Sequence, residues 1–333
     1  MTKVKGKETG KKTVSQNTDK PSKYINPLTD FGFKYLFGVK ELLIDFLNGI
    51  LDIESGIVDL TYDNTERIPH SDEERIARFD LHCTTGKGEH VIIEMQNASQ
   101  DFFKDRTVYY ATFPIQEQAP KGDKNWIFKL QPVYSVNIVN FRIKDIKPDG
   151  TKKAKITEPD GKYITNVQLI DRDTGEVFYK KLTFVYLELP LFTKKENELK
   201  TSIEQWTFVL KHLPDLIEVP EVLQNDVFEK LFQIAEIAKL PAKNRKEYNR
   251  SLKNYRDMMN SITQRDQKIA QRDHIIAQRD QKIAQRDHII AQRDQKIAQR
   301  DQKIAHITQD NKAKDKIIAD LQRQLRFLDK NAN

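Results

Sequence analysis

The chain has 333 residues, more than one ordinary domain needs, and a formal net charge of +7. Its single cysteine, Cys83, excludes an internal disulfide framework and a cysteine-ligated zinc site. No run is apolar enough for a membrane helix, and the lysine-rich start lacks the apolar block of a secretory signal, so we expect a soluble protein of the cytoplasm without a membrane partner.

The positive charge lies at the two ends of the chain. Residues 1–23 carry seven lysines and two acids, 262–305 carry ten basic and six acidic residues, and 306–333 carry six and four. The body, residues 24–261, therefore has 33 basic and 37 acidic residues. Net charge alone gives little evidence for a DNA-binding body. We expect residues 1–23 to be a disordered basic tail.

Ordered structure is expected to begin near residue 24, with Thr29 or Asp30 as the N-cap of a first helix. The order of apolar periodicities after that helix predicts an α/β or α+β body. Further helices are expected over 40–51, 100–118, 196–212, 225–238 and from about 243, and strands over 57–63, 131–141, 161–171 and 177–189.

Residues 78–96, "RFDLHCTTGKGEHVIIEMQ", predict a β-hairpin. If Gly86–Gly88 form a three-residue loop, the numbers of opposed residues sum to 174, and one face of the hairpin becomes wholly apolar. Asp80 then lies opposite Glu94. A loop one residue longer or shorter would instead pair Asp80 with an apolar residue.

Two directly opposed carboxylates destabilise a hairpin, because their β-carbons lie about 5 Å apart. A divalent cation offsets the repulsion, and magnesium prefers carboxylate oxygens. Such an ion could lower the pKa of a water and stabilise charge on a phosphodiester. Gln96 faces the same way and could orient that water or a phosphate oxygen. A solvent-facing hairpin end whose acids never meet fits the residue types about equally well.

Histidines give little support for a metal site in the sequence. His82 shares the acidic face but lies opposite Ile92, and we interpret it as uninvolved. His70, His90 and His212 show no ligand spacing.

These features resemble the PD-(D/E)XK nuclease superfamily and, more closely, its transposase-associated branch, the recombination-promoting nuclease (Rpn) family. The resemblance covers about residues 24–261, and its most specific part is an acid on one strand followed by Glu-x-Gln at the end of the next. It implies an α/β restriction-endonuclease-like core, a mixed sheet flanked by helices, followed by a C-terminal helical region. The matching stretches include "NPLTDFGFKYLFG", "RFDLHCTTGKGEHVIIEMQ", "DRTVYYA" and "QPVYSVNIVNF".

The resemblance implies that Asp80 and Glu94 bind Mg²⁺ or Mn²⁺ and that Gln96 occupies the superfamily's lysine position. Phe79 stands where the superfamily name expects proline. The resemblance matches Asp30 to an additional acid that some members use, and the alternative for Asp30 is an N-cap role. The implied activity is a metal-dependent DNA endonuclease associated with recombination or transposition. The alternative is a catalytically inactive oligomeric or DNA-binding module derived from a mobile element.

The helix after the motif carries one further candidate. Arg106 is a possible accessory residue, because a guanidinium can meet a phosphate bidentately. We interpret Tyr109 and Tyr110 as packing residues.

Residues 264–305 repeat "QRDQKIA" and "QRDHIIA" in strict heptads and predict one long helix. Isoleucine occupies position a, but position d is arginine, which is a poor residue for the apolar seam between two helices. Lysine at g and aspartate at the following e favour a parallel homodimer through 262–333, zipped mainly at 315–328. A solvated single helix is nearly as compatible with the pattern. The expected segments are a tail (1–23), a nuclease-like core (24–190), a helical extension (191–261) and a heptad-repeat coiled-coil helix (262–333).

Overall fold

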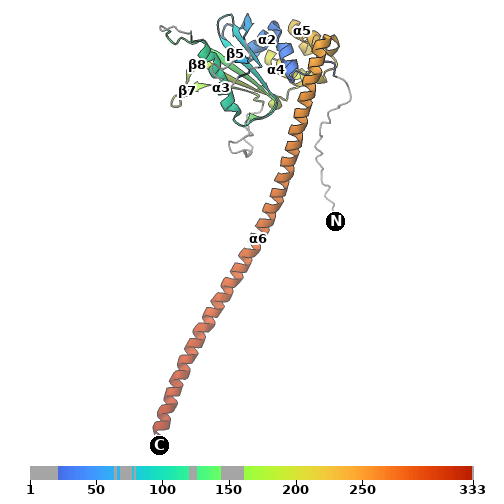
Figure 1. Cartoon of the computed structure of the whole chain (residues 1–333). Coiled ribbons are helices and arrows are strands. Elements are labelled where there is room, and N and C mark those ends of the chain that lie inside the picture. Colours follow the sequence, from blue (N-terminus) through green and yellow to red (C-terminus); the bar gives the residue numbers. More distant parts are fainter. Residues whose placement is uncertain are drawn as a thin grey trace. The chain divides into compact units, whose positions relative to one another are not determined.

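The computed structural model describes residues 22–63, 66–67, 77–78, 80–119, 126–143 and 161–331. The chain divides into two compact units, Met1–Met259 and Asn260–Asn333 (Figure 1). The expected disordered tail falls almost entirely outside the described residues, and so does Phe79.

A mixed six-stranded sheet with the order β1-β4-β5-β6-β8-β7 forms the centre of the first unit. Its three central strands, β5, β6 and β8, are parallel, and the outer strands pair antiparallel. The central strands are rich in valine and isoleucine because parallel strands are covered on both faces. The strands are β1 (Leu60–Tyr62), β4 (Leu81–Thr85), β5 (His90–Gln96), β6 (Val133–Val139), β7 (Ile164–Ile170) and β8 (Val177–Glu188), and a separate pair joins β2 (Glu66–Arg67) to β3 (Ala77–Arg78).

The predicted helices are present, with some ends shifted. The helix expected over 196–212 begins instead at Ser202, because Thr201 caps it: the Glu204 backbone N–H donates to the Thr201 hydroxyl, and the Glu204 carboxylate reaches back to the Thr201 N–H. The helices are α1 (Asp30–Phe37), α2 (Lys40–Ile50), α3 (Phe103–Glu117), α4 (Ser202–His212), α5 (Asp226–Ala235) and α6 (Ala242–Asn331).

One face of the sheet packs against α1, α2, α4 and α5. Val91 and Ile93 of β5 belong to this core, together with the fully buried Trp206 of α4. The Trp206 ring lies 5.5 Å from that of Phe37, and its Nε1–H donates to Asp45 Oδ1 at 2.6 Å. Helices from the region expected to form an extension therefore complete the same hydrophobic core as the first two helices.

The opposite face of the sheet lies under α3. Ile92 is fully buried and packs against Tyr110 and Phe113 of that helix. Thr107 Oγ1 and Tyr186 Oη lie 2.8 Å apart and join α3 to β8. Since side chains alternate along β5, Glu94 and Gln96 share the face of Ile92 and point toward α3.

The hairpin has the predicted register. Leu81 pairs with Ile93 and Cys83 with Val91, so paired numbers sum to 174. The Thr85 N–H donates to the Glu89 carbonyl at 2.9 Å and closes the three-residue loop. Only the second loop glycine, Gly88, has a positive φ, at 87°.

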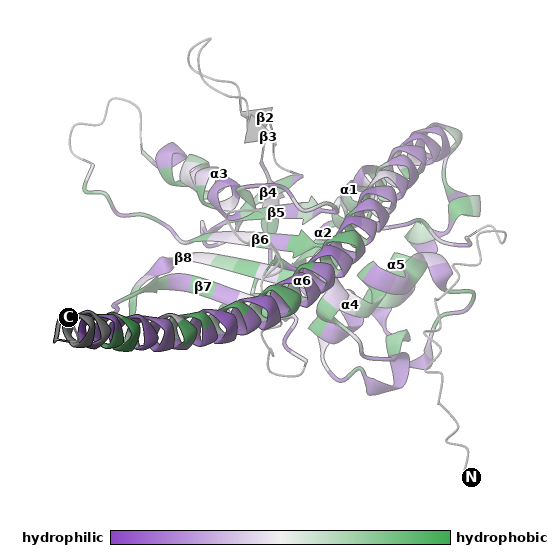
Figure 2. Cartoon of the chain, turned by 90° about the horizontal axis from the view of Figure 1, so that it is seen from below, coloured by the Kyte–Doolittle hydropathy of each residue, from purple (hydrophilic) through white to green (hydrophobic). Residues whose placement is uncertain are grey.

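Helix α6 is continuous over 90 residues, which confirms the expected long helix. Figure 2 shows that most of its residues are hydrophilic, with short hydrophobic stretches between them. The isoleucines at position a between Ile276 and Ile318 are 52–61% exposed. In the part of the chain that the structure describes, no helix has both the length and the apolar character that crossing a membrane requires.

Candidate active site

Asp80 and Glu94 lie at the same end of the β4–β5 hairpin. Asp80 directly precedes β4 and follows the paired register, which places it beside Glu94 across the two strands. The Met95 backbone N–H donates to Asp80 Oδ2 at 2.8 Å. This bond holds the aspartate against the strand that carries the glutamate. The hairpin therefore brings the two carboxylates together.

Glu94 is buried, with 7% of its surface exposed. Its Oε2 accepts from Arg106 Nη2 at 3.2 Å, while Oε1 has no hydrogen-bond partner among the described residues. Burial raises the pKa of Glu94 to about 8, and repulsion by Asp80 adds to the rise while Arg106 opposes it. Burial raises the pKa of Asp80 as well, and the Met95 N–H opposes that rise. The pair is therefore costly to ionise without a further cation.

Arg106 reaches this site from the first turn of α3. Its Nη1 donates to Gln100 Oε1 at 2.8 Å and lies 3.5 Å from Gln96 Oε1, a long contact. Its guanidinium carbon lies 4.9 Å from the centre of the Tyr110 ring. Tyr110 also packs on Ile92, as a packing residue would. Tyr109, in contrast, is 47% exposed.

The family model of PD-(D/E)XK nuclease family transposases matches residues 27–265. The chain belongs to this family. The match confirms the predicted α/β fold class, a PD-(D/E)XK core with a mixed sheet and flanking helices. No curated protein and no solved structure shows significant similarity to the chain.

The N-cap interpretation of Asp30 is wrong in this PD-(D/E)XK chain. Thr29 caps α1, because its hydroxyl accepts from the Gly32 N–H at 3.0 Å. Asp30 is the first residue of the helix and pairs with Lys34 at 2.7 Å. Its negative charge still contributes to the raised pKa of Asp80.

Lys34 is a residue of the site that the sequence did not reveal. Its positive charge lowers the pKa of both Asp80 and Glu94, against the stronger effect of burial. The loop before α1 is held at this end of the sheet because Asn97, which follows β5, donates from Nδ2 to the Leu28 carbonyl at 2.7 Å. Helix α1 thus carries a positive charge that acts electrostatically on both hairpin carboxylates.

Asn137 is a second residue that the sequence did not single out. It pairs with Glu94 in the parallel register of β5 and β6, so the two side chains share a face about 5 Å apart. Its amide nitrogen donates to the Ser135 carbonyl at 3.1 Å, and its Oδ1 is buried without a hydrogen-bond partner among the described residues. Among the described residues, one buried side-chain oxygen on each of these two strands thus has no hydrogen-bond partner.

The PD-(D/E)XK family implies a divalent metal, and the residues present fit one. Asp80 and Glu94 offer the carboxylate oxygens that magnesium and manganese prefer. Glu94 Oε1 and Asn137 Oδ1, which have no hydrogen-bond partner among the described residues, are oxygens that a hard cation would satisfy, directly or through its waters. The ligands would come from adjacent strands at the carboxyl end of β5, where ligands bind in parallel α/β sheets.

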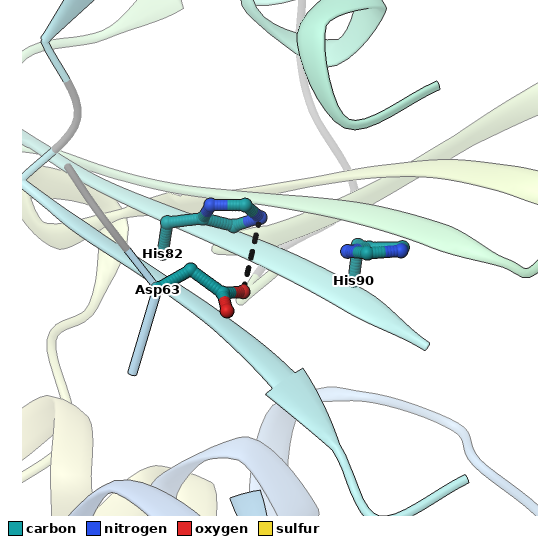
Figure 3. Close-up of side chains that lie close together, drawn as sticks. All are labelled: Asp63, His82 and His90. Atoms are coloured by element: carbon teal, nitrogen blue, oxygen red, sulfur yellow. Dashed lines mark ion pairs between the residues drawn. The ribbon is translucent and has the colours of Figure 1, made fainter. Parts of the chain in front are cut away.

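A separate group of polar side chains lies farther along the same strands (Figure 3). Asp63, His82 and His90 each place a possible ligand atom within 4.8 Å of the other two. The interpretation of His82 as uninvolved and of His90 as lacking ligand neighbours missed this group. No local motif signals it, because its members are 19 and 8 positions apart in the PD-(D/E)XK chain.

Proposed function

We propose that the chain is a metal-dependent DNA endonuclease that hydrolyses phosphodiester bonds in recombination or transposition. Asp80 and Glu94 would hold Mg²⁺ or Mn²⁺. The observation that carries the proposal is the pairing of these two carboxylates, with Glu94 Oε1 lacking a hydrogen-bond partner among the described residues, in a chain of the PD-(D/E)XK family. A buried carboxylate pair is costly without a compensating cation, so the arrangement is best explained by a site that binds one.

A bound cation would supply a water of lowered pKa and stabilise charge on the phosphodiester. Backbone and side-chain groups of the hairpin position the reactants. The Met95 N–H keeps the Asp80 carboxylate directed at the site. Gln96 orients the attacking water or a phosphate oxygen by hydrogen bonding, and its amide transfers no proton.

Two cationic side chains would complete the mechanism. Arg106 has the planar fork that binds a phosphate bidentately, and it already lies beside Glu94 and Gln96. Lys34 would supply the ammonium charge that Gln96 lacks, and its electrostatic effect on both carboxylates supports this role. The proposed roles are therefore metal binding by Asp80 and Glu94, water orientation by Gln96, and charge stabilisation by Arg106 and Lys34.

The proposed partners are DNA and a second copy of this chain. Cleavage of both strands of a duplex needs two active centres, which a dimer through residues 262–333 would provide. The half-exposed isoleucines of α6 support that pairing, because burying them would remove apolar surface from water. The arginines at position d oppose it, since a dimer must leave them at the edge of its seam.

Plasmid nicking with and without Mg²⁺ tests the activity. We expect magnesium-dependent nicking by the wild type and a loss on the order of 10²-fold in Asp80→Asn and Glu94→Gln. Glu54→Gln, which changes an exposed acid elsewhere, is the matched control and should cleave normally. Cleavage that persists in both site variants would assign the activity to another site or a contaminant.

The same experiment decides the alternative. A wild-type chain that binds DNA or self-associates but does not nick it with Mg²⁺ or Mn²⁺ would be an inactive module derived from a mobile element. Gln96 at the superfamily's lysine position is the feature that favours this second function.

A further inference from the structure

Asp63, His82 and His90 come from neighbouring strands of the sheet. Asp63 directly follows β1, and its backbone N–H donates to the His82 carbonyl at 2.8 Å. His82 lies in β4, and His90 begins β5, where it pairs with Thr84. Because side chains alternate along a strand, His82 and Thr84 lie on one face of the sheet, and His90, which pairs with Thr84, lies on that face too. The backbone itself therefore holds these three residues in place.

The separations of the ligand atoms suit a tetrahedral metal ion. His82 Nε2 lies 3.5 Å from Asp63 Oδ2, and Figure 3 shows that contact with His90 beside it. Zinc bonds of about 2.0–2.1 Å at tetrahedral angles place neighbouring ligand atoms roughly 3.4 Å apart. The His82–Asp63 pair already has this separation. The ligand atoms of all three residues lie within 4.8 Å, so a small rotation of side chains closes the group.

The surroundings also orient these ligands. Thr84 Oγ1 donates to Asp63 Oδ2 at 2.7 Å and lies 3.3 Å from His90 Nδ1. Hydroxyl and carboxylate contacts of this kind fix the direction of ligating side chains. His82 is 1% exposed, whereas Asp63 and His90 are half-buried, which leaves a solvent side from which an ion and a water can enter.

We propose that Asp63, His82 and His90 form a metal site for Zn²⁺ or a similar transition ion, distinct from the Asp80–Glu94 pair. Two imidazoles and one carboxylate select borderline ions such as zinc, whereas magnesium prefers oxygen ligands alone. Three protein ligands leave a fourth position for water. The ion would fasten the end of β1 to the β4–β5 hairpin. Asp80 lies two residues from His82 on that hairpin, so the site would stabilise the element that carries the proposed active centre.

Zinc binding to the full-length chain tests the proposal. Metal-free protein, prepared by chelation and dialysis, is titrated with Zn²⁺ in a calorimeter, and the retained zinc is counted by elemental analysis. We expect one tightly held zinc per chain in the wild type and in the double variant D80N/E94Q, with a higher Tm in both. His90→Gln and Asp63→Asn should lose that zinc and the rise in Tm. Co²⁺ in place of zinc should give tetrahedral visible absorption only where the site is intact.

Thr84→Val is the milder companion variant, because it keeps all three ligands and removes only the orienting hydroxyl. We expect it to bind zinc roughly 10- to 100-fold more weakly. The proposal is overturned if the wild type holds no zinc, if D63N and H90Q bind it as the wild type does, or if D80N/E94Q abolishes binding. Plasmid nicking measured on the same samples reports separately on the proposed endonuclease.

Discussion

The carboxylate of Asp80 accepts a hydrogen bond from the backbone N–H of Met95, with 2.8 Å between Oδ2 and nitrogen. Met95 directly follows Glu94, so this bond ties one acid of the proposed centre to the strand that carries the other. The orientation of Asp80 thus depends on the backbone of β5 and not only on the residues that lead into β4.

This bond predicts different effects for two substitutions of Asp80. Asp80→Asn can still accept from the Met95 N–H, and its stability should stay close to that of the wild type. Asp80→Ala leaves that donor without its acceptor and should be about 1 kcal/mol less stable than Asp80→Asn. Urea unfolding of the two variants measures the difference, and equal midpoints would show that the bond contributes nothing. Both variants should lose nicking activity.

The raised pKa of Glu94 predicts that stability falls as pH rises. Between the ordinary glutamate pKa of about 4.3 and the folded value near 8, the folded chain holds a proton that the unfolded chain has released. The free energy of unfolding in chelator should therefore decrease from pH 5 to pH 8.5 by roughly a few kcal/mol because of this group. Glu94→Gln should lack that decrease, and Mg²⁺ should restore stability at pH 8.5 in the wild type only. Parallel pH profiles would contradict the assignment.

Lys34 and Lys40 provide a matched pair of lysine substitutions. Their side chains are 45% and 46% exposed, and among the described residues each forms one ion pair, Lys34 with Asp30 and Lys40 with Asp59. Lys34→Met should reduce nicking on the order of 10²-fold, because the lost charge no longer stabilises the site. It should also shift the pH–rate profile to higher pH, since Lys34 lowers the pKa of both carboxylates. Lys40→Met should leave the rate and profile unchanged. Similar profiles for the two would remove Lys34 from the mechanism.

The hairpin loop predicts unequal costs for its two glycines. Gly88 has a φ of 87°, which strains any residue with a β-carbon, so Gly88→Ala should destabilise the chain by about 1–2 kcal/mol. A β-carbon on Gly86 would meet Asp59 at 3.8 Å, an ordinary contact, and Gly86→Ala should change stability by less than about 0.5 kcal/mol. Denaturant midpoints of the two variants give the comparison. A larger loss for Gly86→Ala would refute the loop assignment.

The proposed dimer predicts that substitutions at positions a and d near the end of α6 will halve the mass of the protein in solution. Sedimentation of the full chain should give a dimer, and Ile318→Lys combined with Leu321→Lys should give a monomer, because two lysines would enter the apolar seam. Asp320→Lys adds the same side chain on the outer face and should remain dimeric. A wild-type chain that is monomeric at high micromolar concentration would end the proposal.

The hairpin could be predicted to the residue from sequence because alternation leaves one acceptable register. A shift by one position would have placed Asp80 opposite an apolar side chain. The N-cap of the first helix was less well determined by the sequence. Thr29 and Asp30 are both good N-cap residues, and only the backbone geometry selects Thr29. Strand 57–63 contracted to Leu60–Tyr62 because pairing with β4 covers only those residues.

Residues that distant elements contribute to the site could not be predicted from the sequence. Asn137 meets Glu94 only through the parallel register of β5 and β6, which tertiary packing sets and no local pattern encodes. Lys34 reaches the hairpin because Asn97 holds the loop before α1 against the end of β5. The Asp63, His82 and His90 group depends in the same way on the order of three strands.

The six nearly identical heptads of α6 also have a consequence for alignment. Two such helices can slide past one another by whole heptads, about 10.5 Å each, and meet almost the same neighbours. The repeats alone thus allow several alignments of the two helices that have nearly equal energy. Only the irregular segment after the repeats, where Asn311 interrupts the isoleucine series, can select one of these alignments. A gain or loss of complete repeats would therefore change the length of the helix but not the alignment that this segment selects.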